Sequence, residues 1–485
     1  MRARCANGRL GGQARVLAVG TVVGLAALGA TSCSVGPRYV PPDLSVPAAF
    51  KEAGDWKPAD PSDEIPRGPW WQIFGDPELN ALEERLSVSN QTLKAAEAQF
   101  AQARALVGAA RAASFPQVGA ALSVTGAGQS ENRPNPMRDP TYVDYLLRLD
   151  VSYEVDLWGR VRQAVSASRA SAQASAADVE STSLSLHAEL AVDYFQARAL
   201  DADRAVLDAT VTAFERALEL TTSRYRGGLV SGADVSLAQT QLLTTRAQAV
   251  DVQARRTQFE HAIAVLIGQP ASSFSLPASP LSAAPAIPAE VPSHLLERRP
   301  DVAAAERRVA AANAQVGITK SAYYPLLMLG GVTGVESSAL ATWLRGASSL
   351  WAVGPTVALA IFDGGRRRSA SEQAQAAYDR SVALYRSVTL NAFREVEDQL
   401  ATLRILEEEA RIQEAAVASA RRALTLARNR YEGGVSTYLE VIATQSALLT
   451  NQRTASNILG RQLAASVLLV KALGGDWVAR SLPRL

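Results

Sequence analysis

The sequence predicts a mainly α-helical chain with four β-strands, built as two similar halves. Residues 160–226 and 366–430 contain no proline or glycine and are rich in alanine, serine, glutamine, leucine and arginine, which is typical of long helices. Shorter segments, such as residues 147–157, alternate apolar and polar side chains with the period of a β-strand. The same order of patterns recurs 206 residues further along the chain.

Composition excludes several classes of protein. The chain has 485 residues, of which 48% are hydrophobic and 20% charged, so it is neither mainly disordered nor a bundle of membrane-spanning helices. Its 49 basic and 47 acidic residues give a net charge of +2, which offers no electrostatic support for binding nucleic acid. Two cysteines and three widely separated histidines (His187, His261 and His294) leave little material for a metal site or a catalytic nucleophile. We therefore expect no enzyme activity, cofactor or metal.

Residues 1–32 have the pattern of a secretory signal peptide. Four arginines with no acidic residue among them precede an uncharged run from Val16 to Ala30, which small residues connect to Cys33. This pattern resembles a bacterial lipoprotein signal, in which Cys33 becomes the lipidated first residue of the mature chain. The alternative is an ordinary cleaved signal followed by an incidental cysteine.

The mature chain divides into an extended proline-rich segment, a first repeat, a second proline-rich segment, a second repeat and a short tail (residues 33–75, 76–268, 269–292, 293–474 and 475–485). Trp70 and Trp71 are expected to anchor the first segment to the body. A helix from Pro77 to Ala113 is expected to open the first repeat, with Asp76 as its N-cap.

Each repeat has the order helix, strand, loop, strand, long helix, Gly-Gly turn and returning helix. The turn residues 225–228 (Tyr-Arg-Gly-Gly) recur as residues 431–434 (Tyr-Glu-Gly-Gly). The spacing between equivalent residues of the two repeats changes within the loop between the two strands, where an insertion is tolerated. The expected strand pairs and helical hairpins occupy residues 116–158 and 159–268 in the first repeat, and residues 325–364 and 365–474 in the second.

The four strands have one apolar face and a length that suits tilted strands of an outer-membrane barrel. Four strands cannot close a barrel, and open edges in lipid would leave backbone groups unpaired. Closure therefore needs two copies for eight strands or three for twelve, of which only the larger leaves a lumen. Helices of ~65 residues span ~100 Å and would continue as a tube below the barrel. The alternative is a soluble sandwich beside ordinary coiled coils.

Five segments, taken in order, resemble one known family. They are CSVGPRY, WWQIFGDP, VDLWGR, LERRPDVAAAE and IFDGGR (residues 33–39, 70–77, 155–160, 296–306 and 361–366). They resemble the TolC-like outer-membrane efflux proteins, and within them the lipoprotein branch that serves tripartite resistance–nodulation–division pumps. The resemblance implies a homotrimer with a twelve-stranded outer-membrane barrel, anchored to membrane lipid at Cys33, and a long α-helical barrel in the periplasm. It also implies a periplasmic adaptor protein and an inner-membrane pump as partners.

The resemblance implies a gate at the periplasmic end of the tunnel. Asp234 and Tyr431 match a pair that links the two tip turns in the family, and Leu439 matches a leucine that plugs the bore. Glu440 matches the first of two acids at the constriction, whereas Ala443 replaces the second, so a trimer would hold a ring of three carboxylates that attracts cations. The residues alone leave two alternatives open, a helix-dipole role for Glu440 and heptad packing for Tyr431.

The resemblance also implies that the adaptor docks on the two tip turns, although each turn could equally be a plain helix hairpin. The docking residues are Gly227, Gly228, Leu229, Val230 and Ser231 in the first turn and Gly433, Gly434, Val435 and Ser436 in the second. The implied function is a passive duct for drugs or other small toxic compounds. The alternatives are an outlet for type I protein secretion or metal efflux, and a structural coiled-coil lipoprotein without a pore.

Overall fold

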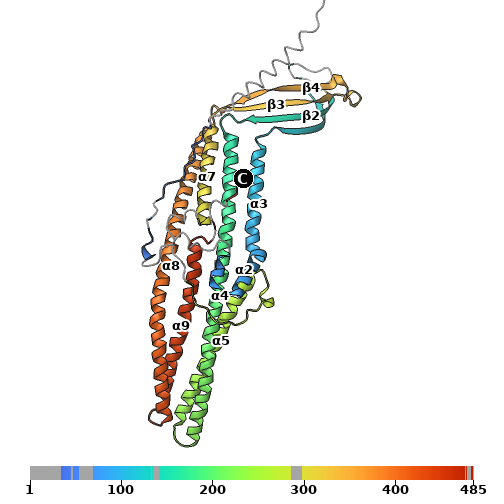
Figure 1. The fold of residues 1–485 in the computed structure, drawn as a ribbon. Coiled ribbons are helices and arrows are strands. Elements are labelled where there is room, and N and C mark those ends of the chain that lie inside the picture. The colour runs from blue at the N-terminus through green and yellow to red at the C-terminus, as the bar shows by residue number, and fades with distance from the viewer. Residues whose placement is uncertain are drawn as a thin grey trace, which may run out of the picture.

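The computed structural model describes residues 34–44, 69–130, 141–285 and 298–475, with isolated positions between and beyond them (47, 49–53, 132, 134, 477, 482 and 483). The predicted signal peptide and Cys33 lie outside the described residues, as do parts of the second proline-rich segment and of the tail. The described chain is elongated, with a sheet at one end and two helical hairpins at the other (Figure 1).

The sheet has four antiparallel strands in the order β1-β2-β3-β4. They are β1 (Gln117–Gly128), β2 (Thr141–Val155), β3 (Leu326–Ser337) and β4 (Ser349–Ala358). The alternation in the sequence extends to Ile361, but β4 ends at Ala358, which pairs with the first residue of β3, Leu326. Pro325 precedes Leu326 and has no N–H to extend the ladder, so the pairing stops there.

The helices of the two repeats match in length. Both α4 and α8 have 67 residues, α5 and α9 have 35, and α3 and α7 have 22. Among the strands that are equivalent in the two repeats, only β2 and β4 differ in length, with 15 residues in β2 and 10 in β4. The α-helices are α2 (Pro77–Ser89), α3 (Gln91–Ala112), α4 (Arg160–Arg226), α5 (Gly232–Leu266), α7 (Pro300–Ser321), α8 (Arg366–Glu432) and α9 (Tyr438–Ala472).

The helices form a wall in which α4 has shorter helices on both sides, whereas α8 lies at one edge and has them on one side only. Helix α4 packs against α3 and α7 near the sheet and against α5 and α9 toward the tips, while α8 packs against α7 and α9. Figure 1 shows α7 above α9, and α3 above α5. Across the wall, the helices are therefore ordered as α3 above α5, then α4, then α7 above α9, and then α8. This order matches that of strands β1 to β4 across the sheet. The wall and the sheet consequently have corresponding free edges.

The helix predicted from Pro77 to Ala113 is broken at Asn90. Asn90 has ψ 125°, and its side chain caps α3 by accepting the Leu93 N–H at 2.9 Å. Its amide group also donates to the Leu266 carbonyl at 2.7 Å, so the break is tied to the end of α5. The predicted cap at Asp76 is confirmed, because its carboxylate accepts the N–H groups of Glu78 and Leu79.

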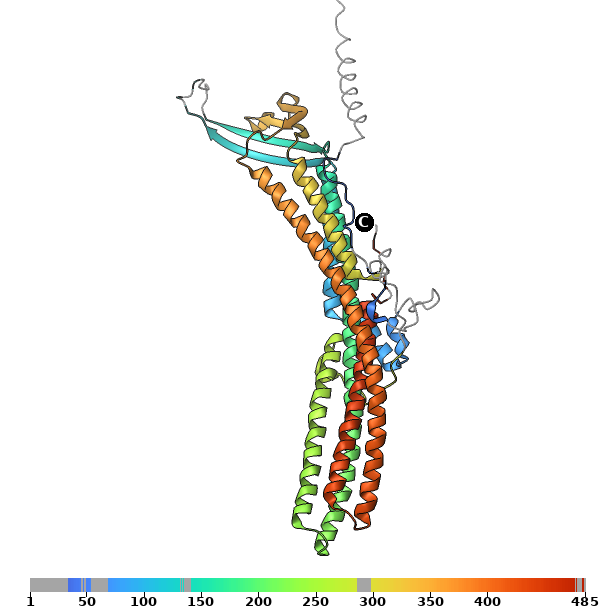
Figure 2. The same cartoon turned by 90° about the vertical axis from the view of Figure 1, so that its left-hand side faces the viewer.

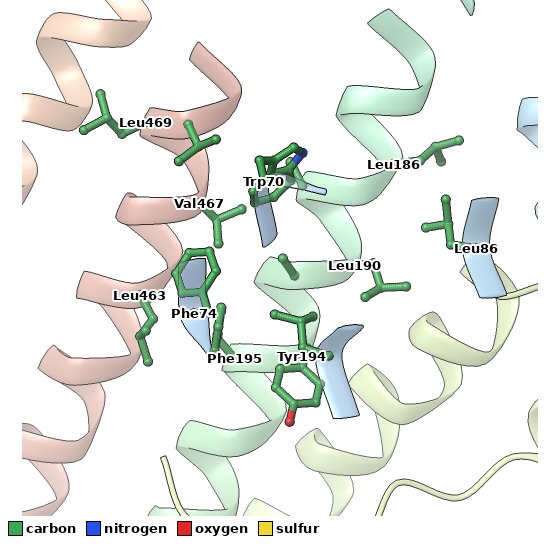
Figure 3. Close-up of a cluster of buried hydrophobic side chains, with 14 of the residues drawn as sticks. Trp70, Phe74, Leu86, Leu186, Leu190, Tyr194, Phe195, Leu463, Val467 and Leu469 are labelled. Atoms are coloured by element: carbon green, nitrogen blue, oxygen red, sulfur yellow. The ribbon is translucent and has the colours of Figure 1, made fainter. Parts of the chain in front are cut away.

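The largest apolar core lies halfway along the wall. Trp70 and Phe74, on the short 3₁₀ helix η2 (Trp70–Phe74), insert between α4 and α9, where they contact side chains such as Phe195 and Val467 (Figure 3). Trp70 is only 2% exposed, which agrees with the predicted anchoring of this segment. Burial of large aromatic side chains contributes about 2–3 kcal/mol each, so this core fixes the N-terminal region to the wall.

The N-terminal strap, defined here as residues 34–44 and 49–53, lies on helices that come much later in the sequence. The Asn313 side chain of α7 donates to the Pro37 carbonyl at 3.0 Å, and Tyr39 donates to Glu306. At the other end of the strap, the backbone N–H of Lys51 donates to Glu397 of α8 at 2.7 Å. The strap thus spans from the upper part of α7 toward the middle of the wall (Figure 2).

Candidate channel gate and membrane-facing sheet

The sheet has an apolar face that nothing in the described chain covers. Directly paired residues share a face, and the pairing of Leu149 with Ala120 and Thr333 defines this one. Its exposed apolar residues are Val118, Leu122, Val124, Leu147, Leu149, Val151, Leu329, Trp351, Val353 and Val357. The opposite face carries charged residues, including Arg148 and Asp150. A continuous apolar surface of this kind marks contact with lipid or with another chain.

The sheet is also open at both edges. Within the described chain, β1 pairs only with β2 and β4 pairs only with β3. Unpaired strand edges leave rows of backbone donors and acceptors that another chain can complete. The uncovered face and the open edges therefore both require contacts, with lipid or with another chain, that a single copy does not supply.

Both tip turns have the same backbone geometry. In the first, Gly228 has φ 73° and the Leu229 N–H donates to the Arg224 carbonyl at 2.9 Å. In the second, Gly434 has φ 74° and Val435 makes the equivalent bond at 2.8 Å. These bonds form a Schellman motif, in which a left-handed glycine ends the helix without strain. Each turn then presents one exposed apolar side chain, with Leu229 77% and Val435 74% exposed.

The Asp234 carboxylate is held within its own turn. It accepts the Ser231 N–H at 2.9 Å and the Ser231 hydroxyl at 2.8 Å, while the Asp234 N–H donates to the Ser231 oxygen at 3.3 Å. This reciprocal arrangement is a capping box at the start of α5. The structure therefore brings Asp234 to Ser231, whereas the hydroxyl of Tyr431 has no hydrogen-bond partner within the described ranges.

Tyr431 is buried between the two hairpins. It is 6% exposed, and its ring lies 5.5 Å from that of Tyr438, centroid to centroid. The Arg224 guanidinium of the first hairpin lies 4.3 Å from the Tyr431 ring centroid and donates to the Tyr431 carbonyl at 3.1 Å. Burial also raises the pKa of Tyr438 to about 12, so the Tyr438 phenol stays neutral at physiological pH. Arg224 thus fastens the first tip to the second by a cation–π contact and a hydrogen bond.

Leu439 and Glu440 lie in the first turn of α9. Leu439 is 60% exposed, and Glu440 pairs with Arg430 of α8 at 3.2 Å. This ion pair is solvent-accessible, so it contributes at most about 1 kcal/mol. Sequence reasoning missed both Arg224 and Arg430. Because they occupy equivalent positions in the two repeats, the repeated arginine before each Gly-Gly turn was the signal that could have found them.

Two buried titratable groups meet beside the central core. Glu83 of α2 is fully buried, and one of its carboxylate oxygens lies 2.6 Å from Nδ1 of His187 on α4. Trp71 stacks on the His187 ring with a centroid separation of 4.4 Å. Burial raises the pKa of Glu83 well above its usual range and lowers that of His187 to about 4. Sequence reasoning treated His187 only as an isolated histidine.

Two further findings concern the described part of the chain. No group of three or more histidine, cysteine, aspartate and glutamate side chains there could hold a metal ion. No helix there combines the length and the apolar character needed to cross a membrane.

The start of the strap is held where the sheet meets the helices. The Val35 N–H donates to the Trp158 carbonyl at 3.3 Å, and the Gln163 side chain donates to the Ser34 hydroxyl at 3.0 Å. Trp158 follows the end of β2 and Gln163 lies in the first turn of α4. The residue next to Cys33 is therefore at the helical end of the apolar sheet.

Comparison with known proteins identifies the family. The sequence profile described as outer membrane efflux protein matches residues 82–269 and 291–475, which together are more than half of the chain. The chain belongs to the outer membrane efflux protein family. The two matched regions correspond closely to the two repeats.

Individual relatives of this efflux protein cover most of its length. The pyoverdine export outer membrane protein OpmQ of Pseudomonas putida is 33% identical over 430 residues, which is 86% of this chain and 90% of the relative. The probable efflux pump outer membrane protein TtgC of Pseudomonas putida is 30% identical, with 92% and 93% covered. The solved outer-membrane channel OprN has a TM-score of 0.85 and 29% identity, with 91% of this chain and 99% of that chain covered.

Family membership explains the open sheet and the long wall. This efflux protein is an outer-membrane channel and not an enzyme. It is a homotrimer whose strands form a shared barrel in the outer membrane, with its helices forming the tunnel in the periplasm. It acts with a periplasmic adaptor and an inner-membrane pump. Lipid therefore covers the apolar face, and neighbouring copies complete the strand edges.

Proposed function

We propose that this efflux protein is the passive outer duct through which an inner-membrane pump expels drugs or other small toxic compounds. The observation that supports it best is the combination of an uncovered apolar sheet, open at both edges, with helices of 67 residues that end in two tip hairpins. One end suits the membrane, and the other lies ~100 Å away by helix length, where a periplasmic partner can reach it.

The names of relatives indicate the range of cargo. They include a toluene efflux pump protein, an antibiotic efflux pump protein and a pyoverdine export protein, and the last has 33% identity. A second candidate function is therefore export of a compound that the cell itself makes. Both cargo classes are small molecules and need the same passive duct.

Deletion and complementation test the duct function. A strain that lacks this protein should accumulate a fluorescent dye several-fold more than its parent and show lower minimal inhibitory concentrations for several drugs, and the wild-type gene should restore both. If the deletion strain still secretes its coloured or fluorescent metabolites, the result favours drug efflux over export of an endogenous compound. Unchanged accumulation and unchanged secretion in the deletion strain would contradict both functions.

We infer that Asp234, Tyr431, Leu439 and Glu440 belong to the gate. Tyr431 lies at the contact between the hairpins, and Leu439 and Glu440 expose side chains beside it on α9. Three Glu440 carboxylates around one axis would favour cations. Glu440→Gln should therefore lower the cation selectivity of single channels in bilayers, with little effect on trimer stability. Leu468→Gln, a change on the same helix far from the tip, serves as the control. Unchanged selectivity in Glu440→Gln would exclude an acidic constriction at this residue.

We infer that the tip turns receive the adaptor. Leu229 and Val435 are exposed at equivalent positions, and apolar residues that protrude from polar surroundings are suited to a complementary groove. Replacing both by aspartate should reduce co-purification of the cognate adaptor at least several-fold, while the trimer stays intact. The exposed pair Val88 of α2 and Leu106 of α3, which lies far from the tips, provides a control for general surface changes. Full adaptor recovery with both tips altered would place the docking surface elsewhere.

We infer that Cys33 carries the lipid anchor. Ser34, the next residue, is held beside Trp158 at the helical end of the apolar sheet, which is the level at which acyl chains could enter the membrane. Metabolic labelling with radioactive palmitate should mark the wild type but not Cys33→Ser. Label retained in Cys33→Ser would disprove acylation at this residue.

A further inference from the structure

The apolar surface of the protein continues beyond the helical end of the sheet. Strand β4 ends at Ala358, and its residues Val353 and Val357 lie on the face that lipid covers. Ile361 and Phe362, which connect β4 to α8, are 92% and 89% exposed, the highest values among large apolar side chains in the described ranges. Exposed apolar groups of this kind indicate contact with a partner. The apolar surroundings nearest to them are the acyl chains beside β4.

Unneutralised positive charge lies at the same level. Residues 366–368, at the start of α8, are three consecutive arginines. Arg367 and Arg368 have acidic partners, whereas the exposed Arg366 makes no ion pair within the described chain. Lys320, which is exposed in the last turn of α7, likewise has no acidic partner among the described residues. The junction between the sheet and the helices therefore carries cations that this copy does not neutralise.

Helix stability does not account for these arginines. The partial positive charge at a helix N-terminus favours acidic residues in the first turn and disfavours basic ones. Helices α2, α5, α7 and α9 follow this preference, because each has an acidic residue in its first turn. Helix α8, which begins directly below the sheet, has arginines there and no acidic residue. A negatively charged partner outside the chain would account for this reversal.

The ends of α7 and α8 form one surface beside the start of the strap. The Arg367 guanidinium lies 5.5 Å from the Tyr323 ring centroid, and the Tyr323 N–H donates to the Lys320 carbonyl at 3.2 Å. Gly36 of the strap packs closely on α7, because a Cβ on Gly317 would come within 3.2 Å of the Gly36 Cα. Lys320 follows Gly317 by three residues and thus lies on the same side of α7. The cations are therefore next to the strap, at the level of the membrane boundary.

We propose that this junction surface, defined as Lys320, Ile361, Phe362 and Arg366, binds anionic phospholipids of the leaflet that faces the periplasm. The two cations contact the headgroup phosphate, while the two apolar side chains lie among the acyl chains. A free anion would leave the apolar pair uncovered, and an acyl chain alone would leave the cations unpaired. The proposal goes beyond the duct function and depends only on the position of the sheet in the outer membrane.

Lipid titration of purified full-length trimers in an uncharged detergent tests the surface. Fluorescent phosphatidylglycerol is the probe, and its polarisation reports binding. Lys320→Gln combined with Arg366→Gln should weaken binding about 25-fold, because each cation near an anionic lipid contributes roughly a five-fold factor. Ile361→Ser combined with Phe362→Ser should also weaken binding, although the charge is unchanged. High salt should weaken binding to the wild type.

The same helix provides a matched control. Arg380 and Arg386 are exposed and make no ion pair within the described part of α8, and they lie ~21 and ~30 Å from its start. Arg380→Gln combined with Arg386→Gln removes the same charge and should bind the probe as the wild type does. The charge-retaining pair Lys320→Arg and Arg366→Lys should also bind normally, which shows that exchange of these side chains leaves the fold intact.

Several results would overturn the surface. Equal weakening by the control pair would show attraction to net charge alone, and equal affinity for phosphatidylcholine would exclude selection of anionic lipid. Displacement of the probe by inorganic phosphate would assign the cations to a free anion. The titration contains no pump, so failure of the deletion assay would contradict the duct but not this surface. Binding retained in Cys33→Ser separates the surface from acylation in the same way.

Discussion

The two repeats have the same backbone but use equivalent positions differently. Tyr225 and Tyr431 precede the two Gly-Gly turns, yet Tyr225 is 51% exposed and Tyr431 is 6% exposed. Asp234 bonds to Ser231 in its own turn, whereas its counterpart Glu440 pairs with Arg430 of the adjacent helix. The first tip is thus self-contained, while the second is held by contacts that include Arg224 from the first. The two hairpins therefore share their backbone geometry, and the differences between their side chains make the second hairpin depend on the first.

The repeats also differ at the level of the central core. His187 of α4 and Phe393 of α8 occupy equivalent positions, and both are buried. The first repeat places a polar pair with Glu83 where the second places an aromatic ring. A buried polar pair costs desolvation that an apolar residue does not, and it is strongly destabilised when one partner is removed.

The largest expected effect comes from making the first repeat resemble the second. His187→Phe leaves the buried Glu83 carboxyl group without its hydrogen bond and forces a larger ring into the same space, so we expect a combined loss of about 4 kcal/mol. Urea unfolding of detergent-solubilised trimers measures it. Adding Glu83→Leu should recover most of the loss, and Phe393→Leu should cost only about 1 kcal/mol. A fully stable His187→Phe protein would show that the pair is dispensable.

The next effect concerns the two tyrosines. Tyr431→Ala removes a buried ring from between the hairpins and should cost about 3 kcal/mol, whereas the exposed Tyr225→Ala should change stability by less than about 0.5 kcal/mol. Tyr431→Ala should also increase uptake of a large antibiotic, because the second tip loses its contact with Arg224. Equal effects of the two substitutions on stability and uptake would show that the two tyrosines do not differ in their roles.

The pH dependence of stability sharpens the comparison at the core. The folded state keeps His187 neutral down to its pKa of about 4, whereas the unfolded chain binds a proton below about pH 6.5. The stability present above pH 6.5 is therefore lost progressively as the pH falls toward 4. His187→Gln, which does not titrate, should show a smaller loss in urea unfolding midpoint over this range. A parallel decline in both proteins would assign the acid sensitivity to other groups.

The smallest effect concerns the caps of the returning helices. Ser231→Ala breaks the capping box of α5 and should cost about 1 kcal/mol. Thr437→Ala, at the equivalent position, should cost less, because the Thr437 side chain makes no capping hydrogen bond to α9. Limited proteolysis of each variant, with mass spectrometry of the fragments, shows which turn has become more sensitive to the protease. Greater cleavage in Thr437→Ala would reverse the ranking.

The sequence predicted what periodicity and glycine positions encode. The matched lengths of α4 and α8 and the two Gly-Gly turns were readable, because long helices and left-handed turns depend on local residues. The contact of Arg224 with Tyr431 was not, since these residues are 207 positions apart and on different hairpins. The break at Asn90 was also missed, because the bond that ties it to Leu266 is made across 176 positions. The gate and docking roles of the tip residues stay predictions.

The N-terminal strap has a consequence for the order in which the protein can fold. It precedes both repeats in the sequence, yet Tyr39 bonds to Glu306 across 267 positions and Lys51 bonds to Glu397 across 346. The first of these acceptors lies near the start of the second repeat, and the other lies just past its middle. Contacts of such long sequence separation form late and slowly. The strap therefore docks late, and its full attachment reports that a new copy already has its first repeat and the first half of its second repeat.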